Sequence, residues 1–285
     1  MDKIYQIKKD DWPEPLLEIP QPPEKLYALG KLPDPKYIYL AVVGSRKYSN
    51  YGKDVCQKLI TGLSGYPIVI VSGLAIGIDS IAHQSALEAG LTTVAFPGSG
   101  LSRKVLYPKN NLNLAEKIIK NGGCLISEFE PDSVATIYSF PKRNRLMAGI
   151  SKAVLIIEAE MKSGSLITAR LALDYNKDVL AVPGSIFSNN ANGVNWLIRE
   201  GAIPVTTSED VLEALGFDTS SFKETLRYQS CQPEEKAILQ LLTEPMDRDD
   251  LIILSGLETS EANALLSIME VRGLIKESNG QILRL

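Results

Sequence analysis

The stretch Tyr39-Leu40-Ala41-Val42-Val43-Gly44-Ser45-Arg46 is an apolar run that ends in a glycine, a hydroxyl residue and an arginine. An apolar run bounded by glycine is typical of a strand that is buried on both faces of a parallel sheet. Similar runs alternate with helical stretches through the following residues, which predicts strand-helix-strand units. We therefore expect an α/β fold, with a Rossmann-like, mostly parallel sheet and helices on both of its faces.

The expected elements follow from where apolar runs give way to amphipathic stretches. The expected strands are residues 39–43, 68–72, 92–96, 124–127, 153–158, 179–182 and 203–205, and the expected helices are 50–63, 77–89, 111–120, 167–175 and 194–200.

The chain is expected to have four parts. Residues 1–36 are rich in proline, which disfavours long helices, and form an extended lead-in. Residues 37–216 form the Rossmann-like core, and 217–232 form a linker without a clear period. Residues 233–285 show three helical stretches and a hairpin, the pattern of a small C-terminal winged-helix domain.

Composition indicates a globular protein, with 285 residues of which 45% are hydrophobic and 22% charged. No apolar run follows the first residues, so we expect no signal peptide, no membrane span and a cytoplasmic location. The three cysteines, Cys56, Cys124 and Cys231, are far apart, and His83 is the only histidine. This pattern argues against metal sites and histidine-dependent catalysis, and we expect no cofactor and no enzymatic activity.

The net charge of −4 is unevenly distributed. Residues 218–285 contain 12 acidic and 7 basic residues, whereas residues 1–217 contain 22 acidic and 23 basic ones. The expected core is therefore nearly neutral, with its cations gathered in a few loops where they can contact a polyanion.

Two loops that follow expected strands have the composition of phosphate-binding turns. Gly44, Ser45 and Arg46 precede a helix whose free amides favour an anion, and arginine can add a bidentate contact. Gly73 follows the next strand, where glycine permits either a ligand or close packing of helix and sheet. For the loop with Gly44, Ser45 and Arg46, the alternative is a plain turn with a solvated arginine. Asp79 and His83 in the following helix are interpreted as a cap and a structural imidazole.

Two further segments are expected to be phosphate-binding loops. Phe140-Pro141-Lys142-Arg143-Asn144-Arg145 combines three cations with an aromatic residue, as single-stranded nucleic acid requires; a solvated basic turn is the alternative. Ser163, Gly164 and Ser165 follow a buried strand and offer hydroxyls and amides for an anion. In contrast, the helix 260–271 of the winged-helix domain carries acidic residues, which argues against reading duplex DNA.

Several ordered motifs together resemble the DNA-processing protein A family (DprA, also called Smf). The motifs are Gly44-Ser45-Arg46, the segment Ser72 to His83, Tyr107-Pro108, Phe140 to Arg145 and Glu158 to Thr168. The resemblance covers residues 11–215 and extends to the winged-helix tail.

The resemblance implies a protein that binds single-stranded DNA, protects incoming strands and loads the recombinase RecA in natural transformation and homologous recombination. It also implies a homodimer, for which Val211, Leu212 and Leu215 are one candidate surface unless they belong to the core. The DNA-binding residues carried over from the family are Gly44, Ser45, Arg46, Gly73, Phe140, Lys142, Arg143, Asn144, Arg145, Ser163, Gly164, Ser165 and Thr168.

The sequence departs from the family pattern in three places. Ile76 stands where relatives often have a basic residue, and the segment between Gly100 and Tyr107 is slightly longer, with Arg103 and Lys104. We also expect no counterpart of the helical domain that many relatives carry before the core. Two alternatives remain open: a phosphoribohydrolase-type nucleotide-processing enzyme, for which Pro97-Gly98-Ser99-Gly100 supplies glycines but no following acid, and a protein adaptor that binds no DNA.

Overall fold

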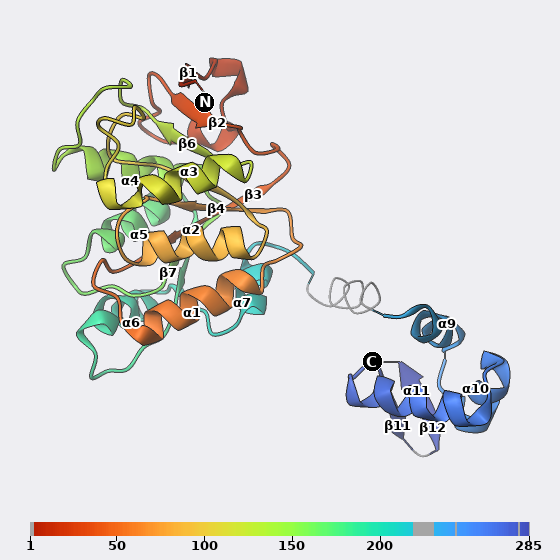
Figure 1. Cartoon of the computed structure of the whole chain (residues 1–285). Helices are drawn as coiled ribbons and strands as arrows, with labels where there is room; N and C mark the ends of the chain where they lie inside the picture. Colours follow the sequence, from red (N-terminus) through yellow and green to blue (C-terminus); the bar gives the residue numbers. More distant parts are fainter. Residues whose placement is uncertain (1–2, 219–230, 243, 279, 285) are drawn as a thin grey trace. The chain divides into compact units, whose positions relative to one another are not determined.

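The structure is a computed structural model that describes residues 3–218, 231–242, 244–278 and 280–284. The chain divides into two compact units, residues 1–217 and 218–285 (Figure 1). The expected linker, 217–232, falls mostly on residues 219–230, which lie outside the described residues.

The described part of the first unit contains a nine-stranded sheet in the order β1-β2-β6-β5-β4-β3-β7-β8-β9. The pairs β1/β2 and β2/β6 are antiparallel, and every other neighbouring pair is parallel. The strands are β1 (Tyr5–Gln6), β2 (Tyr27–Gly30), β3 (Ile38–Val43), β4 (Ile68–Ser72), β5 (Thr92–Ala95), β6 (Cys124–Ser127), β7 (Ala153–Ile156), β8 (Asp178–Ala181) and β9 (Ile203–Pro204).

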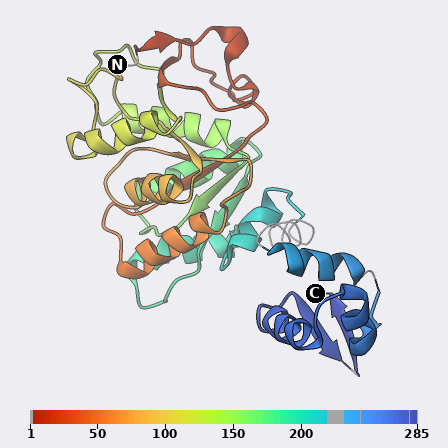
Figure 2. The same ribbon diagram turned by 45° about the vertical axis from the view of Figure 1, so that its right-hand side comes forward.

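Helices cover both faces of this sheet, as predicted (Figures 1 and 2). On one face α2 contacts both α1 and α3, and α1 contacts α7, whereas α4 packs against α5. The helices are α1 (Asn50–Thr61), α2 (Ile78–Glu88), α3 (Leu112–Lys120), α4 (Ser139–Ile150), α5 (Gly164–Asp174), α6 (Asn192–Arg199) and α7 (Ser208–Ala214), with 3-10 turns η1 (Lys9–Asp11), η2 (Glu14–Leu16), η3 (Lys109–Asn111) and η4 (Asn189–Ala191).

Successive strand residues enter different apolar cores because side chains alternate across a sheet. Val94 belongs to the core that also contains residues of α4, α5 and α6, whereas the next residue, Ala95, packs in the core that contains residues of α3. This two-sided burial explains why the strands are almost continuously apolar.

The N-terminal segment differs from the expected simple lead-in because it adds strands to the sheet. Residues of β2 pair with β6, with Tyr27 opposite Ser127, and Trp12, Leu16 and Ile19 are buried in the main core. Prolines are compatible with this arrangement, since they lie outside the two short strands and exclude only long helices.

The prediction of a loop at Phe140–Arg145 is wrong, because these residues form the first turns of α4. Proline is tolerated in the first turn of a helix, where its missing N–H would have no partner within the helix. Helix α5 likewise begins at Gly164, before the expected residue 167, and Ser163 is its N-cap. Val211, Leu212 and Leu215 are buried within the first unit, so they do not form an exposed dimer surface.

The second unit has the predicted winged-helix pattern. Its helices are α9 (Pro233–Leu241), α10 (Arg248–Ser255) and α11 (Thr259–Val271), and its strands β10 (Met246–Asp247), β11 (Ile275–Ser278) and β12 (Gln281–Arg284) form an antiparallel sheet in the order β10-β12-β11. Ile238, Leu251, Leu266 and Met269 are among its core residues.

Within the described residues, no single helix is long and apolar enough to cross a membrane. The pair α10 and α11 meets the length and composition requirements only when joined, and it bends by 116° between the two helices.

Candidate nucleic-acid interface

The largest group of predicted site residues surrounds a cavity of about 500 Å³. The cavity lies at the carboxyl ends of β3 and β7, where successive strand connections change from one face of the sheet to the other. Ligands of open α/β sheets bind at this kind of position. The predicted residues that line the cavity are Gly44, Ser45, Arg46, Phe140, Arg143, Asn144, Ser163, Gly164, Ser165 and Thr168.

The loop after β3 is held against the start of α2 by two close backbone approaches. Gly77 has φ +95°, and a Cβ there would lie 2.4 Å from the carbonyl oxygen of Ser45. A Cβ on Gly44 would meet the side chain of Ile78 at 2.8 Å. Glycine is therefore needed at both positions for packing of the two loops, whether or not a ligand binds.

Arg46 is an exposed cation at the edge of this cavity. Its guanidinium carbon lies 5.5 Å from the centre of the Phe140 ring, which lies 5.8 Å from the ring of Tyr107. A guanidinium stacked on an aromatic ring is held in place while its charge stays open to an anion. Phe140 is itself accommodated by Gly98, where a Cβ would lie 2.6 Å from the ring.

Arg143 takes a structural position that the sequence does not reveal. The residue is only 5% exposed, and its guanidinium donates hydrogen bonds to the carbonyl oxygens of Gly73 and Phe96 and, at 3.0 Å, to Asn144 Oδ1. Burial lowers the pKa of Arg143 to about 10, while the charge of Asp79 opposes this shift. A Cβ on Gly73 would lie 2.3 Å from Nη1 of Arg143, so Gly73 makes room for the guanidinium.

The other two cations of α4 lie outside the lining of the cavity. Arg145 donates to Glu128 at 2.5 Å, and both side chains are 13% exposed. Burial raises the pKa of Glu128, and the charge of Arg145 opposes the shift. Lys142 is exposed to solvent, so it is the α4 cation that can meet a phosphate without breaking an internal contact.

The N-terminus of α5 supplies a second anion-binding feature of the same cavity. Ser163 caps the helix by accepting a hydrogen bond from the Ser165 amide at 3.3 Å, and the two hydroxyl oxygens lie 2.6 Å apart. Lys162 lines the cavity beside them. Free helix amides, hydroxyls and an ammonium group together favour a phosphate here.

Glu158, which ends an expected strand and begins one of the family motifs, holds the Arg46 loop in place. Its buried carboxylate accepts hydrogen bonds from the Ser49 amide at 2.9 Å and from the Ser49 hydroxyl at 2.5 Å. Asn190 donates to the Lys47 carbonyl oxygen at 2.8 Å and so supports the same loop. The sequence signal that could have indicated this role is a single acidic residue at the end of an apolar run.

Asp79 and His83 are buried parts of the scaffold rather than members of an exposed acid–base pair. Asp79 accepts from the Gly73 amide at 3.1 Å, and burial raises its pKa although Arg143 opposes the shift. Nδ1 of His83 lies 2.7 Å from the Thr93 hydroxyl, and burial lowers the pKa of this imidazole to about 3.

The glycine-rich segment Pro97-Gly98-Ser99-Gly100, the feature that favoured an enzyme, packs internally. Gly98 faces Phe140, and Gly100 faces the carbonyl oxygens of Glu130 and Pro131. In the part of the chain that the structure describes, no group of three or more histidine, cysteine, aspartate or glutamate side chains could hold a metal ion.

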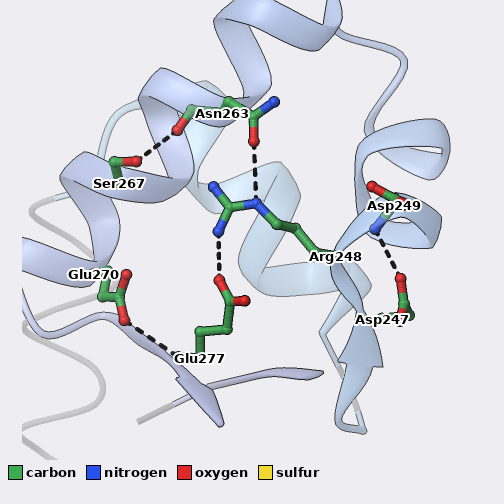
Figure 3. A network of polar contacts seen from close by, with 7 residues as sticks. All are labelled: Asp247, Arg248, Asp249, Asn263, Ser267, Glu270 and Glu277. Atoms are coloured by element: carbon green, nitrogen blue, oxygen red, sulfur yellow. Dashed lines mark hydrogen bonds and ion pairs between the residues drawn. The ribbon is translucent and has the colours of Figure 1, made fainter. Parts of the chain in front are cut away.

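Two arginines of the described winged-helix residues are engaged in internal contacts. Arg248 forms an ion pair with Glu277 and donates to Asn263 at 3.0 Å, as Figure 3 shows. Arg272 pairs with the buried Glu235. The exposed surface of α11 includes Glu261 and Glu270, so this helix offers phosphates little attraction.

Two family models match the chain: DNA recombination-mediator protein A over residues 3–216, and DprA winged helix domain over residues 223–281. Protein Smf of Escherichia coli is 41% identical over 206 residues, covering 72% of this chain and 54% of that protein. DNA processing protein DprA of Streptococcus pneumoniae is 43% identical over 213 residues, covering 75% of this chain and 74% of that protein. The chain thus matches about half of the first relative's length and three quarters of the second's.

Solved structures agree with these matches. DNA processing protein A from Streptococcus pneumoniae has a TM-score of 0.68 at 40% identity, with 74% of each chain covered. DNA processing protein A from Helicobacter pylori, described with a single-stranded DNA binding mode, has a TM-score of 0.66 at 31% identity, covering 75% of this chain and 98% of that one.

Proposed function

The chain belongs to the DNA recombination-mediator protein A family, and we propose that it binds single-stranded DNA at the cavity between β3 and β7. The observation that carries this proposal is that the exposed Arg46, stacked on Phe140, lines the same cavity as the capped N-terminus of α5. The Helicobacter pylori relative, described as binding single-stranded DNA, supports the same ligand.

In this proposal the residues divide into two roles. Arg46, Lys142 and the Ser163–Ser165 turn bind phosphates, with Gly44, Ser45 and Thr168 shaping the cavity, while Phe140 supports Arg46 and contacts a base. Gly73, Arg143, Asn144 and Arg145 act indirectly by holding α4 against the sheet: Arg143 bonds to the Gly73 carbonyl oxygen and to Asn144, Arg145 pairs with Glu128, and Gly73 leaves room for the Arg143 guanidinium.

We further propose that the protein acts by binding rather than by catalysis. It would protect incoming strands and load the recombinase RecA in natural transformation and homologous recombination, in the cytoplasm and as a homodimer. Membership of a family described as recombination mediators supports this role. The winged-helix unit would serve protein contacts, since its acidic α11 is poorly suited to DNA.

Equilibrium binding of a fluorescent oligothymidine, compared with a duplex of equal length over a range of salt concentrations, tests the first step. Phosphate contacts predict weaker binding as salt rises, and stacking predicts a preference for single strands. The Arg46→Ala, Lys142→Ala double variant should lose most of the affinity. Lys58→Ala is the control, because this exposed lysine lies in the last turn of α1 and does not line the cavity.

Failure of the wild-type protein to bind either strand would contradict the proposal. The loading step has a separate test, in which the rate of recombinase filament formation is measured on strands coated with a single-stranded DNA-binding protein. Acceleration by the wild-type protein and not by the double variant is the expected result.

A further inference from the structure

We propose that Tyr107 and Ile76 form a nucleobase subsite beside the phosphate cavity, with Tyr107 as the stacking residue. This inference rests on the proposed function, since its ligand is a base of the same single strand. Neither residue belongs to the cationic or hydroxyl groups from which the phosphate site is built.

The subsite is a small cavity of about 40 Å³ that adjoins the phosphate cavity. Arg46, Ala75, Phe140 and Arg143 line both cavities, and the stacked pair Arg46 and Phe140 forms part of the wall between them. The side chains that line only the small cavity come from Ile76, Tyr107 and Pro108, and they are apolar apart from the Tyr107 hydroxyl. A strand whose phosphate contacts Arg46 therefore brings the attached base to an apolar surface.

Exposure distinguishes these side chains from ordinary core residues. Tyr107 is 45% exposed and Ile76 is 47% exposed, although both lie beside a polar cavity. The Tyr107 ring contacts Phe140 at 5.8 Å with an interplanar angle of 56°, which fixes its orientation without burying it. An exposed aromatic ring next to a phosphate-binding cation is the combination that binds single strands through stacking.

The backbone that carries these residues is anchored before any ligand arrives. The Tyr107 amide donates to the buried Ser99 hydroxyl at 3.2 Å. Asn111 donates to the Leu74 carbonyl oxygen at 2.7 Å and to the Ser80 hydroxyl at 2.8 Å. The segment with Tyr107 is thus tied to the loop with Ile76, and little ordering is needed on binding.

The boundary that the subsite shares with the phosphate cavity indicates which ligand it binds. A stable protein partner would need a larger apolar area than these few side chains provide. A nucleotide matches both the cationic cavity and the apolar subsite, because it carries an anionic phosphate and a flat ring in one residue. Ile76 adds apolar contact to the base but no charge, so the subsite should favour stacking over base-specific hydrogen bonds.

The test compares an oligothymidine with an abasic strand of the same length and the same number of phosphates. Tyr107→Ala should weaken oligothymidine binding about tenfold, because stacking on one aromatic residue is lost. It should change abasic-strand binding by less than about twofold, since the phosphate contacts remain. Tyr107→Phe should retain wild-type affinity, and Tyr37→Ala, a comparably exposed tyrosine beside the amino end of β3, is the control.

An equal loss on both strands, or no loss on either, would overturn the subsite while leaving DNA binding intact. Absence of wild-type binding to oligothymidine would instead overturn the proposed function and the subsite with it. Photocrosslinking of the wild-type protein to a strand containing 5-iodouracil needs no variant. A crosslinked peptide containing Tyr107 is expected, and crosslinks exclusively elsewhere would contradict the assignment.

Discussion

Arg143 donates a hydrogen bond to the carbonyl oxygen of Gly73, 70 residues earlier in the chain, and its guanidinium occupies the space that a side chain at position 73 would fill. The same group donates to the Phe96 carbonyl oxygen. One arginine therefore holds α4 against the carboxyl ends of β4 and β5. Because Phe140 lies in the same helix, its position depends on these hydrogen bonds.

Replacement of this arginine should primarily reduce stability. In Arg143→Met the carbonyl oxygens of Gly73 and Phe96 lose their donor and the buried Asp79 loses its neighbouring positive charge. We expect the free energy of unfolding to fall by about 3 kcal/mol, the size typical of removing one partner of a buried charge network. Urea unfolding measures this change in the free energy of unfolding. Lys142→Met, at the exposed neighbouring position, should stay within about 0.5 kcal/mol of wild type.

Glu158 should affect DNA binding through Ser49 and not through its own charge. In Glu158→Gln an amide donor replaces one of the two oxygens that accept from Ser49, so the charge-assisted bond from the Ser49 hydroxyl is lost and only a weaker neutral contact can replace it. We expect a stability loss of about 1–2 kcal/mol and weaker single-strand binding with an unchanged slope of log affinity against log salt. Loss of a phosphate contact would instead reduce that slope.

Glu160→Gln is the control for this variant, because Glu160 is exposed and lines the cavity. Removal of its negative charge should leave stability unchanged and should strengthen binding at low salt. Equal behaviour of the two variants would contradict a positioning role for Glu158.

The strands of the core were predictable because burial on both faces of a sheet makes each of them continuously apolar. The helix at Ser139–Ile150 was not, since proline and a cluster of cations resemble a turn in isolation. Its stability comes from packing: Leu146, Met147 and Ile150 enter the main core. Tertiary burial therefore outweighs the local signal in this segment.

The residues that line the cavity were predicted from loop composition and from the family resemblance, but their division into surface and scaffold was not predicted. Arg46 and Arg143 look alike in the sequence, and only the order of the strands places the carbonyl oxygens of Gly73 and Phe96 around the second one. Glu158 was missed because its partner, Ser49, lies 109 residues away.

Stability should decrease in mild acid because of His83. Burial, aided by the charge of Arg143, lowers its pKa to about 3 in the folded protein, whereas an unfolded histidine titrates near 6.5. Between these values the unfolded chain binds a proton that the folded chain does not, so stability falls as pH falls, by at most about 1.4 kcal/mol per pH unit.

The buried Asp79 has a raised pKa and therefore contributes with the opposite sign as pH falls. For this reason the measurement is a comparison of urea unfolding between pH 7 and pH 4.5 for wild type and His83→Gln. The variant should have the flatter profile, and parallel profiles would show that His83 is not the responsible group.

Removal of residues 218–285 should leave single-strand binding nearly intact. The cavity is built entirely from the first unit, and the removed segment carries 12 acidic against 7 basic residues. A chain ending at Phe217 keeps the contact of that ring with Tyr66 at 5.2 Å and the bond from Lys152 to the Leu215 carbonyl oxygen, so the end of the core stays anchored. Affinity within about threefold of wild type and an unchanged salt slope are expected. A large loss of affinity, with the core still folded by circular dichroism, would assign DNA contacts to the winged-helix unit despite its acidic surface.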